Sequence, residues 1–165
     1  METITINLDG DIGFEFFCRL RHHDDQISIA LKGHLLAEYM LDRFVREKTQ
    51  RNPIRLTFSR KFELLSQVGI LPEHLVVNLQ RLNTYRNRLA HELDSSIVQQ
   101  ERVIRNARGI DVKLRSHGRR YPERYYLKML VHVCLTDLHN QMVYMNLDPR
   151  FGRDITANKR VEPTR

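Results

Sequence analysis

A stripe of leucines between residues 72 and 93 constrains the fold more than any other feature of this sequence. Successive leucines are separated by four, three, seven and four residues, which places them on one face of a helix. They are Leu75, Leu79, Leu82, Leu89 and Leu93. Pro72 suits the first turn of such a helix. A helix with this stripe must bury it against other elements, so we predict a helix over residues 72–93 in the core.

Other segments share this apolar periodicity, and Gly69 and Pro122 are placed to end and begin helices. The segments are residues 12–21, 27–48, 58–68 and 122–146. Alternation over residues 4–8 favours a short strand. Residues 94–121 are polar and basic, and part of this stretch is expected to be helical. We therefore predict an all-α fold, an up-and-down bundle of four to five helices with a possible short N-terminal strand.

The chain is expected to form one domain over residues 1–147, because 165 residues can bury a single sizeable core. Residues 148–165 carry little apolar material and are expected to be a flexible C-terminal tail. No apolar run approaches the ~20 residues of a membrane span, and no secretory signal is visible. Cys18 and Cys134 are isolated thiols, which fits a reducing cytoplasm and gives no metal or disulfide framework. We therefore expect a cytoplasmic protein without a cofactor.

The basic charge of the chain points to a polyanionic partner. The net charge is +7, and 21 of the 27 basic residues are arginines, whose planar fork suits phosphate. Basic residues are dense over 102–128, where interleaved tyrosines could stack on bases. The candidate nucleic-acid-binding residues are Arg88, Arg115, Arg119, Arg120, Arg124 and Lys128. This segment directly follows the leucine-striped helix and could border the same cleft as that helix. An ordinary solvated basic face is the alternative.

Arg86 interrupts the leucine stripe, because it occupies the gap between Leu82 and Leu89. A guanidinium on a buried face must be paired or reach a wet cleft. Asn87 and His91 are four residues apart and share a side of the helix, with His91 about 140° from Arg86. Arg86 is therefore expected to point toward the bundle, and Asn87 and His91 out of its flank. A partner subunit docking on that flank would close a site.

Simpler interpretations stand beside this one. One Arg–His pair at this separation is about the number expected by chance in so arginine-rich a chain. Arg86 could form a buried pair with an acid such as Glu38, which lies one helical turn from His34 at the edge of the early helix's apolar face. His91 alone would be an ordinary surface histidine. The run from His22 to Asp25 contains plausible metal ligands, but is more typical of a loop ending in a helix N-cap. His132 and His139 are separated by an Asp137 that faces elsewhere, so no metal site is predicted.

The segment LNTYRNRLAHE resembles the signature of the HEPN superfamily, in which an arginine, often followed by asparagine, precedes a histidine by four to six intervening residues. Arg86, Asn87 and His91 match the four-residue form. AEYMLDRFV, at residues 37–45, resembles the family's long early helix. FSRKFELLSQVGIL, at residues 58–71, resembles the helix and turn before the signature helix. The order of segments is that of the mannitol-repressor-like branch, and the resemblance covers roughly residues 12–146.

The resemblance implies metal-independent RNA cleavage by a homodimer whose two signature helices line one cleft. His91 would act as general base or acid, Arg86 would bind the scissile phosphate, and Asn87 would orient one of them. Glu38 and His34 are the expected supporting residues. A toxin or phage-defence effector, with a nucleotidyltransferase-like antitoxin as a candidate partner, is one expectation. A non-catalytic HEPN interaction or regulatory module, or a basic helical nucleic-acid-binding protein, are the alternatives.

Overall fold

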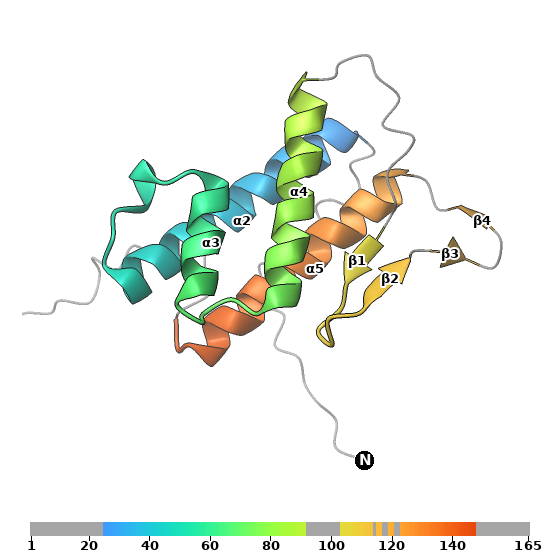
Figure 1. The fold of residues 1–165 in the computed structure, drawn as a ribbon. Helices are drawn as coiled ribbons and strands as arrows, with labels where there is room; N and C mark the ends of the chain where they lie inside the picture. Colours follow the sequence, from blue (N-terminus) through green and yellow to red (C-terminus); the bar gives the residue numbers. More distant parts are fainter. Residues whose placement is uncertain (1–24, 92–102, 114, 117–118, 121–122, 148–165) are drawn as a thin grey trace, which may run out of the picture.

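The computed structural model describes residues 25–91, 103–113, 115–116, 119–120 and 123–147, and at residues 90, 91, 115, 116, 119, 120 and 123 it describes the backbone alone. The strand and helix expected over residues 4–8 and 12–21, and the tail after residue 147, lie outside the described residues. Most of the described chain is helical (Figure 1). The helices are α2 (Gln26–Thr49), α3 (Phe58–Gln67), α4 (Glu73–His91) and α5 (Glu123–Tyr144), with a 3₁₀ turn, η1 (Pro53–Arg55).

These bounds confirm the all-α bundle, since each helix lies within a few residues of the range that its periodicity predicts. Local signals explain several ends. The side chain of Asp25 accepts hydrogen bonds from the backbone N–H of Ile27 and Ser28, so it is the N-cap of α2. Gly69 follows α3 with a φ of +73°, a left-handed conformation that suits glycine.

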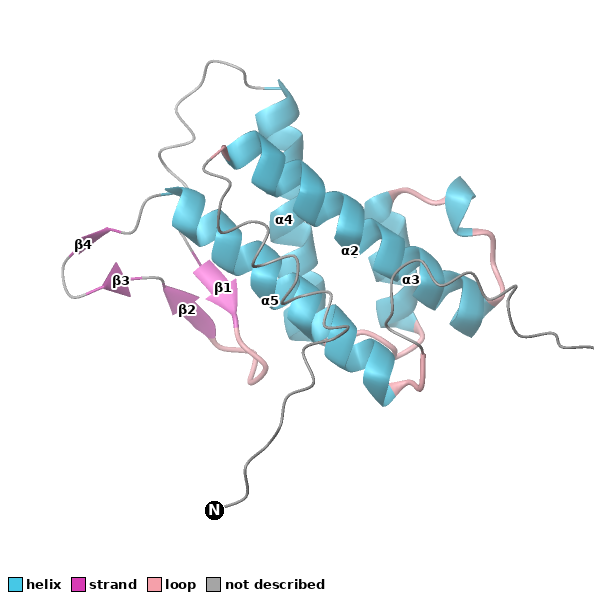
Figure 2. Cartoon of the chain, turned by 180° about the vertical axis from the view of Figure 1, so that it is seen from behind, coloured by secondary structure: helices cyan, strands magenta, loops and turns pink. Residues whose placement is uncertain are grey.

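The helices form two layers. Figure 1 shows α3 and α4 in front of α2 and α5, and Figure 2 shows the same two layers from behind. Helices α2 and α5 approach each other closely at Gly33 of α2, where an added Cβ would lie 2.6 Å from both methyl carbons of Val131 on α5. Leu75, Leu79 and Leu82 are fully buried in the core between the layers. The leucine stripe thus has the role that its spacing predicts.

The segment after α4 differs from its prediction. Its described part contains strands and no helix: β1 (Val103–Arg105) pairs antiparallel with β2 (Asp111–Lys113), and β3 (Arg115–Ser116) pairs with β4 (Arg119–Arg120). The turn between β1 and β2 has a local cause. Asn106 accepts hydrogen bonds from the N–H groups of Arg108 and Ile110, and Gly109 takes a φ of +76°.

No helix among the described residues is long and apolar enough to cross a membrane.

Candidate functional site

Helix α4 carries the predicted site residues at the edge of its buried face. Leu82 is fully buried, Arg86 and Leu89 are half-buried, and Leu89 packs against the core. Arg86 therefore lies where the interrupted leucine stripe predicts. Helix α4 extends to His91, so Arg86, Asn87 and His91 belong to one continuous helix. The side chain of His91 lies outside the described residues.

The guanidinium of Arg86 forms few hydrogen bonds to the described residues. Its Nη1 donates a hydrogen bond to Oδ1 of Asn87 at 3.0 Å. Its Nε is buried and has no hydrogen-bond partner among the described residues. A guanidinium has five N–H donors, and the one hydrogen bond that Arg86 makes to a described side chain is to a neutral amide oxygen, which does not compensate its charge. The arrangement favours an incoming anion, to which such a group binds strongly.

His34 of α2 lies across from this part of α4. It is 7% exposed, its Nε2 lies 3.3 Å from Oδ1 of Asn83, and its ring centroid lies 4.0 Å from that of Phe58. Burial lowers the pKa of His34, and the nearby positive charge of Arg86 acts in the same direction. The structure thus brings the predicted supporting residue His34 close to Arg86, as a histidine that resists protonation.

Glu38, the other predicted supporting residue, has a different partner from the one considered in the sequence. Its Oε1 lies 2.7 Å from Nζ of Lys61 on α3, and its Oε2 lies 3.9 Å from Nδ1 of His34. The described residues contain no ion pair between Glu38 and Arg86. The alternative in which Glu38 neutralises Arg86 is therefore wrong, because Glu38 forms its ion pair with the buried Lys61.

Sequence reasoning missed Lys61, which is 3% exposed despite its charge. Its ammonium lies 2.7 Å from carboxylate oxygens of both Glu38 and Asp42. Burial opposes the charge of Lys61, but its hydrogen bonds to Asp42 and Glu38 outweigh burial and raise its pKa. An acidic pair at positions 38 and 42, one helical turn apart beside an apolar face, is the signal that could have predicted a buried cation.

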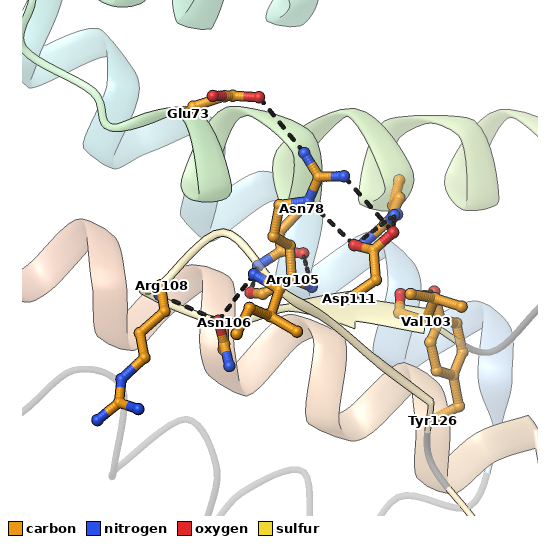
Figure 3. Close-up of polar contacts among 10 residues, drawn as sticks. Glu73, Asn78, Val103, Arg105, Asn106, Arg108, Asp111 and Tyr126 are labelled. Carbon is orange, nitrogen blue, oxygen red and sulfur yellow. Dashed lines mark hydrogen bonds and ion pairs between the residues drawn. The ribbon is translucent and has the colours of Figure 1, made fainter.

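The opposite flank of α4 holds the first hairpin. Asn78 is fully buried, and it both donates to the carbonyl and accepts from the N–H of Arg105 in β1, each at 2.8 Å. Figure 3 shows this contact and Asp111 of β2 beside Arg105. Asp111 also accepts a hydrogen bond from Arg81 of α4. The hydrogen bond from Arg105 lowers the pKa of Asp111. These contacts attach the hairpin firmly to α4, and sequence reasoning missed them.

Tyr126 of α5 holds β1 from the other side. Its hydroxyl donates to the carbonyl of Val103 at 3.3 Å, and burial raises the pKa of Tyr126 to about 12. It is therefore a buried structural residue rather than a platform for bases. Tyr125 is exposed.

The basic candidates do not all share the flank of Arg86. Arg88 is exposed and lies about 200° around α4 from Arg86. Figure 1 shows α3, which packs beside His34, and the β1–β2 hairpin on opposite sides of α4. The expectation that the whole basic segment borders the same cleft as Arg86 is therefore wrong for this hairpin, because Asn78 fixes it to the far flank.

The remaining basic candidates lie on β3, β4 and α5. Arg124 is exposed and Lys128 half-buried, both on the first turns of α5. For Arg115, Arg119 and Arg120 the structure describes only the backbone, in β3 and β4. The described residues contain no group of three or more metal-ligating side chains, and Asp137 instead lies 3.4 Å from His74.

Comparisons of the chain with protein-family models, with curated proteins and with solved structures find no match.

Proposed function

We propose that the protein is a metal-independent endoribonuclease of the HEPN type that acts as a homodimer in the cytoplasm. The observation that carries the proposal is Arg86, a half-buried guanidinium whose buried Nε has no hydrogen-bond partner among the described residues. The carboxylates of the described residues form no ion pair with it either, and its Nη1 donates only to the neutral amide of Asn87. Holding such a cation beside the core costs free energy unless an anion is supplied. A backbone phosphate of RNA is an anion of suitable size and geometry for a guanidinium.

The proposed chemistry needs an acid and a base near that phosphate. The ribose 2′-oxygen attacks the adjacent phosphorus, and the bond to the 5′-oxygen of the next nucleotide breaks. The products end in a 2′,3′-cyclic phosphate and a 5′-hydroxyl. His91 takes the proton from the 2′-hydroxyl or returns one to the leaving oxygen, and the reference pKa of a histidine side chain, about 6.5, suits either step. Arg86 stabilises the charge that develops on the phosphate.

The position of His91 supports a two-subunit site. On a regular helix, position 91 lies about 140° around the axis from position 86 and about 40° from position 87. Positions 86 and 91 of one helix therefore do not share a face. A second copy docked on this flank would bring the missing histidine, with Asn87 between the two positions. A toxin or phage-defence role, held in check by a nucleotidyltransferase-like antitoxin, belongs to the same proposal.

The test is RNA cleavage in EDTA by the wild-type protein, His91→Ala and Arg86→Ala. Loss of general acid–base catalysis predicts a decrease of about 10²–10⁴-fold for His91→Ala. Loss of charge stabilisation predicts about 10²–10³-fold for Arg86→Ala. Arg55→Ala, an exposed position in η1, is the matched control and should cleave like the wild type. Absence of cleavage would leave a non-catalytic HEPN module, and equal cleavage by all variants would mean a contaminating nuclease.

A second candidate function is nucleic-acid binding through the basic segment, and the hairpin favours it. In Figure 3 the side chain of Arg108 at the hairpin tip extends away from the other labelled residues, whereas Arg105 is held by Asp111. This candidate predicts that RNA or DNA binding survives Arg86→Ala but weakens when Arg119 and Arg120 are both replaced by alanine. Mobility shifts at two salt concentrations would show whether the lost contacts are to phosphates.

A further inference from the structure

Asn83 lies one helical turn before Arg86 and Asn87, on the same flank of α4. Its Oδ1 lies 3.3 Å from Nε2 of His34. An amide oxygen only accepts hydrogen bonds, so Nε2 of His34 must be the donor. This contact turns the oxygen of Asn83 toward α2 and its NH₂ group away from it. Nδ2 of Asn83 makes no hydrogen bond to any described residue.

The ring that holds Asn83 is itself held in place. His34 packs against Phe58 with an angle of 31° between the rings, and little of its surface is exposed. Its Nδ1 is 3.9 Å from Glu38, which is beyond hydrogen-bond distance, while the other oxygen of Glu38 contacts Lys61. Turning the ring of His34 would therefore lose its hydrogen bond to Asn83 without a replacement among the described residues. Residues of α2 and α3 thus set the direction of the Asn83 amide.

The carboxylates of Glu38 and Asp42 both lie 2.7 Å from the ammonium of Lys61 and pair with it. Among the described residues, Arg86 has no carboxylate partner, so it is a cation that can bind an external anion. Asn83 offers a neutral donor one helical turn away. Side chains at this spacing start about 5–6 Å apart, which allows both to reach one phosphate group.

We propose that Asn83 is a further substrate-binding residue, whose Nδ2 donates a hydrogen bond to a non-bridging oxygen of the phosphate held by Arg86. The inference rests on the proposed ribonuclease function, which it deepens by adding a residue outside the Arg86, Asn87 and His91 signature. The hydrogen bond from His34 keeps the amide of Asn83 in its donating orientation. Two residues on one helix face then bind the phosphate, which fixes both its position and its orientation.

The test measures binding rather than cleavage, by fluorescence anisotropy with a 2′-O-methyl oligoribonucleotide that has no nucleophilic 2′-hydroxyl. Asn83→Asp keeps an oxygen for His34 but removes the NH₂ donor, and Asn83→Leu removes the donor without adding charge. We expect both variants to bind about tenfold more weakly or worse, the loss expected for a hydrogen bond to a charged group. Thr84→Asp, an exposed neighbour, adds the same charge and should change affinity about threefold at most.

The outcomes separate this inference from the ribonuclease itself. If both Asn83 variants bind as tightly as the wild type, or Thr84→Asp weakens binding as much as Asn83→Asp while Asn83→Leu does not, Asn83 makes no contact with the phosphate. No binding by the wild-type protein would also overturn the inference. If the EDTA assay shows no cleavage while the Asn83 variants lose affinity, the ribonuclease fails and the phosphate contact stands.

Discussion

Replacing Asn78 with leucine tests how the β1–β2 hairpin is attached to the bundle. The side chain of Asn78 is fully buried and makes two hydrogen bonds of 2.8 Å to the backbone of Arg105. Leucine has a similar volume, so the change removes the hydrogen bonds without leaving a large cavity. Two such bonds contribute about 1 kcal/mol each, and leaving their backbone partners unpaired adds to this cost. We therefore expect the free energy of unfolding to fall by about 2–4 kcal/mol.

Urea denaturation followed by circular dichroism gives the change in global stability, and hydrogen exchange gives the local effect. In the wild type the amide of Arg105 should be protected, because its N–H is bound by Asn78. In Asn78→Leu this amide should exchange much faster. Asn140→Leu, at an exposed position of α5, is the matched control and should change stability by about 0.5 kcal/mol at most. A loss below about 0.5 kcal/mol for Asn78→Leu, with protection at Arg105 retained, would refute the attachment.

Two further predictions concern helix α2. Gly33→Ala places a methyl group 2.6 Å from Val131, so overpacking should cost about 1–3 kcal/mol of stability and outweigh the helix propensity that alanine adds. In a double-mutant cycle, Val131→Ala should recover part of this loss. Purely additive effects of the two substitutions would contradict the close contact. Burial lowers the pKa of His34, so below its ordinary value of 6.5 the unfolded chain binds a proton that the folded protein resists. The wild-type free energy of unfolding should therefore fall as the pH drops below 6.5, and His34→Leu should show a shallower fall in denaturation curves; parallel curves would refute this role.

The helices were predictable because their apolar spacing is a property of the sequence within each segment. Leu75, Leu79 and Leu82 are buried as the wheel requires, and Arg86 lies at the edge of the same face. The hairpin was not predicted, because β1 and β2 are short and β1 is held by Asn78 and Tyr126 from two helices. The local signal was the turn of Asn106 and Gly109 between apolar residues. Its pairing depended on partners far away in sequence.

The electrostatic partners of the site were harder to predict than its position. Glu38 was correctly placed at the edge of the apolar face of α2, but its sequence position does not say whether Arg86 or Lys61 pairs with it, because these two residues come from different helices. Lys61 holds the carboxylate at 2.7 Å, which leaves Arg86 without it. The role proposed for Asn83 likewise depends on its contact with His34 of α2, which the sequence does not reveal. A sequence pattern gives the face on which a side chain lies, whereas the choice between competing partners follows from how the helices pack.

The most direct test of the proposed chemistry uses a DNA strand containing one ribonucleotide, incubated with the protein in EDTA. The nucleophile is the 2′-hydroxyl, so we expect cleavage at that single position, with a 2′,3′-cyclic phosphate on one product and a 5′-hydroxyl on the other. His91→Ala should leave the strand intact over the same time. Cleavage at deoxynucleotides, products with a 5′-phosphate, or cleavage by His91→Ala at the wild-type rate would contradict a site built on Arg86 and His91.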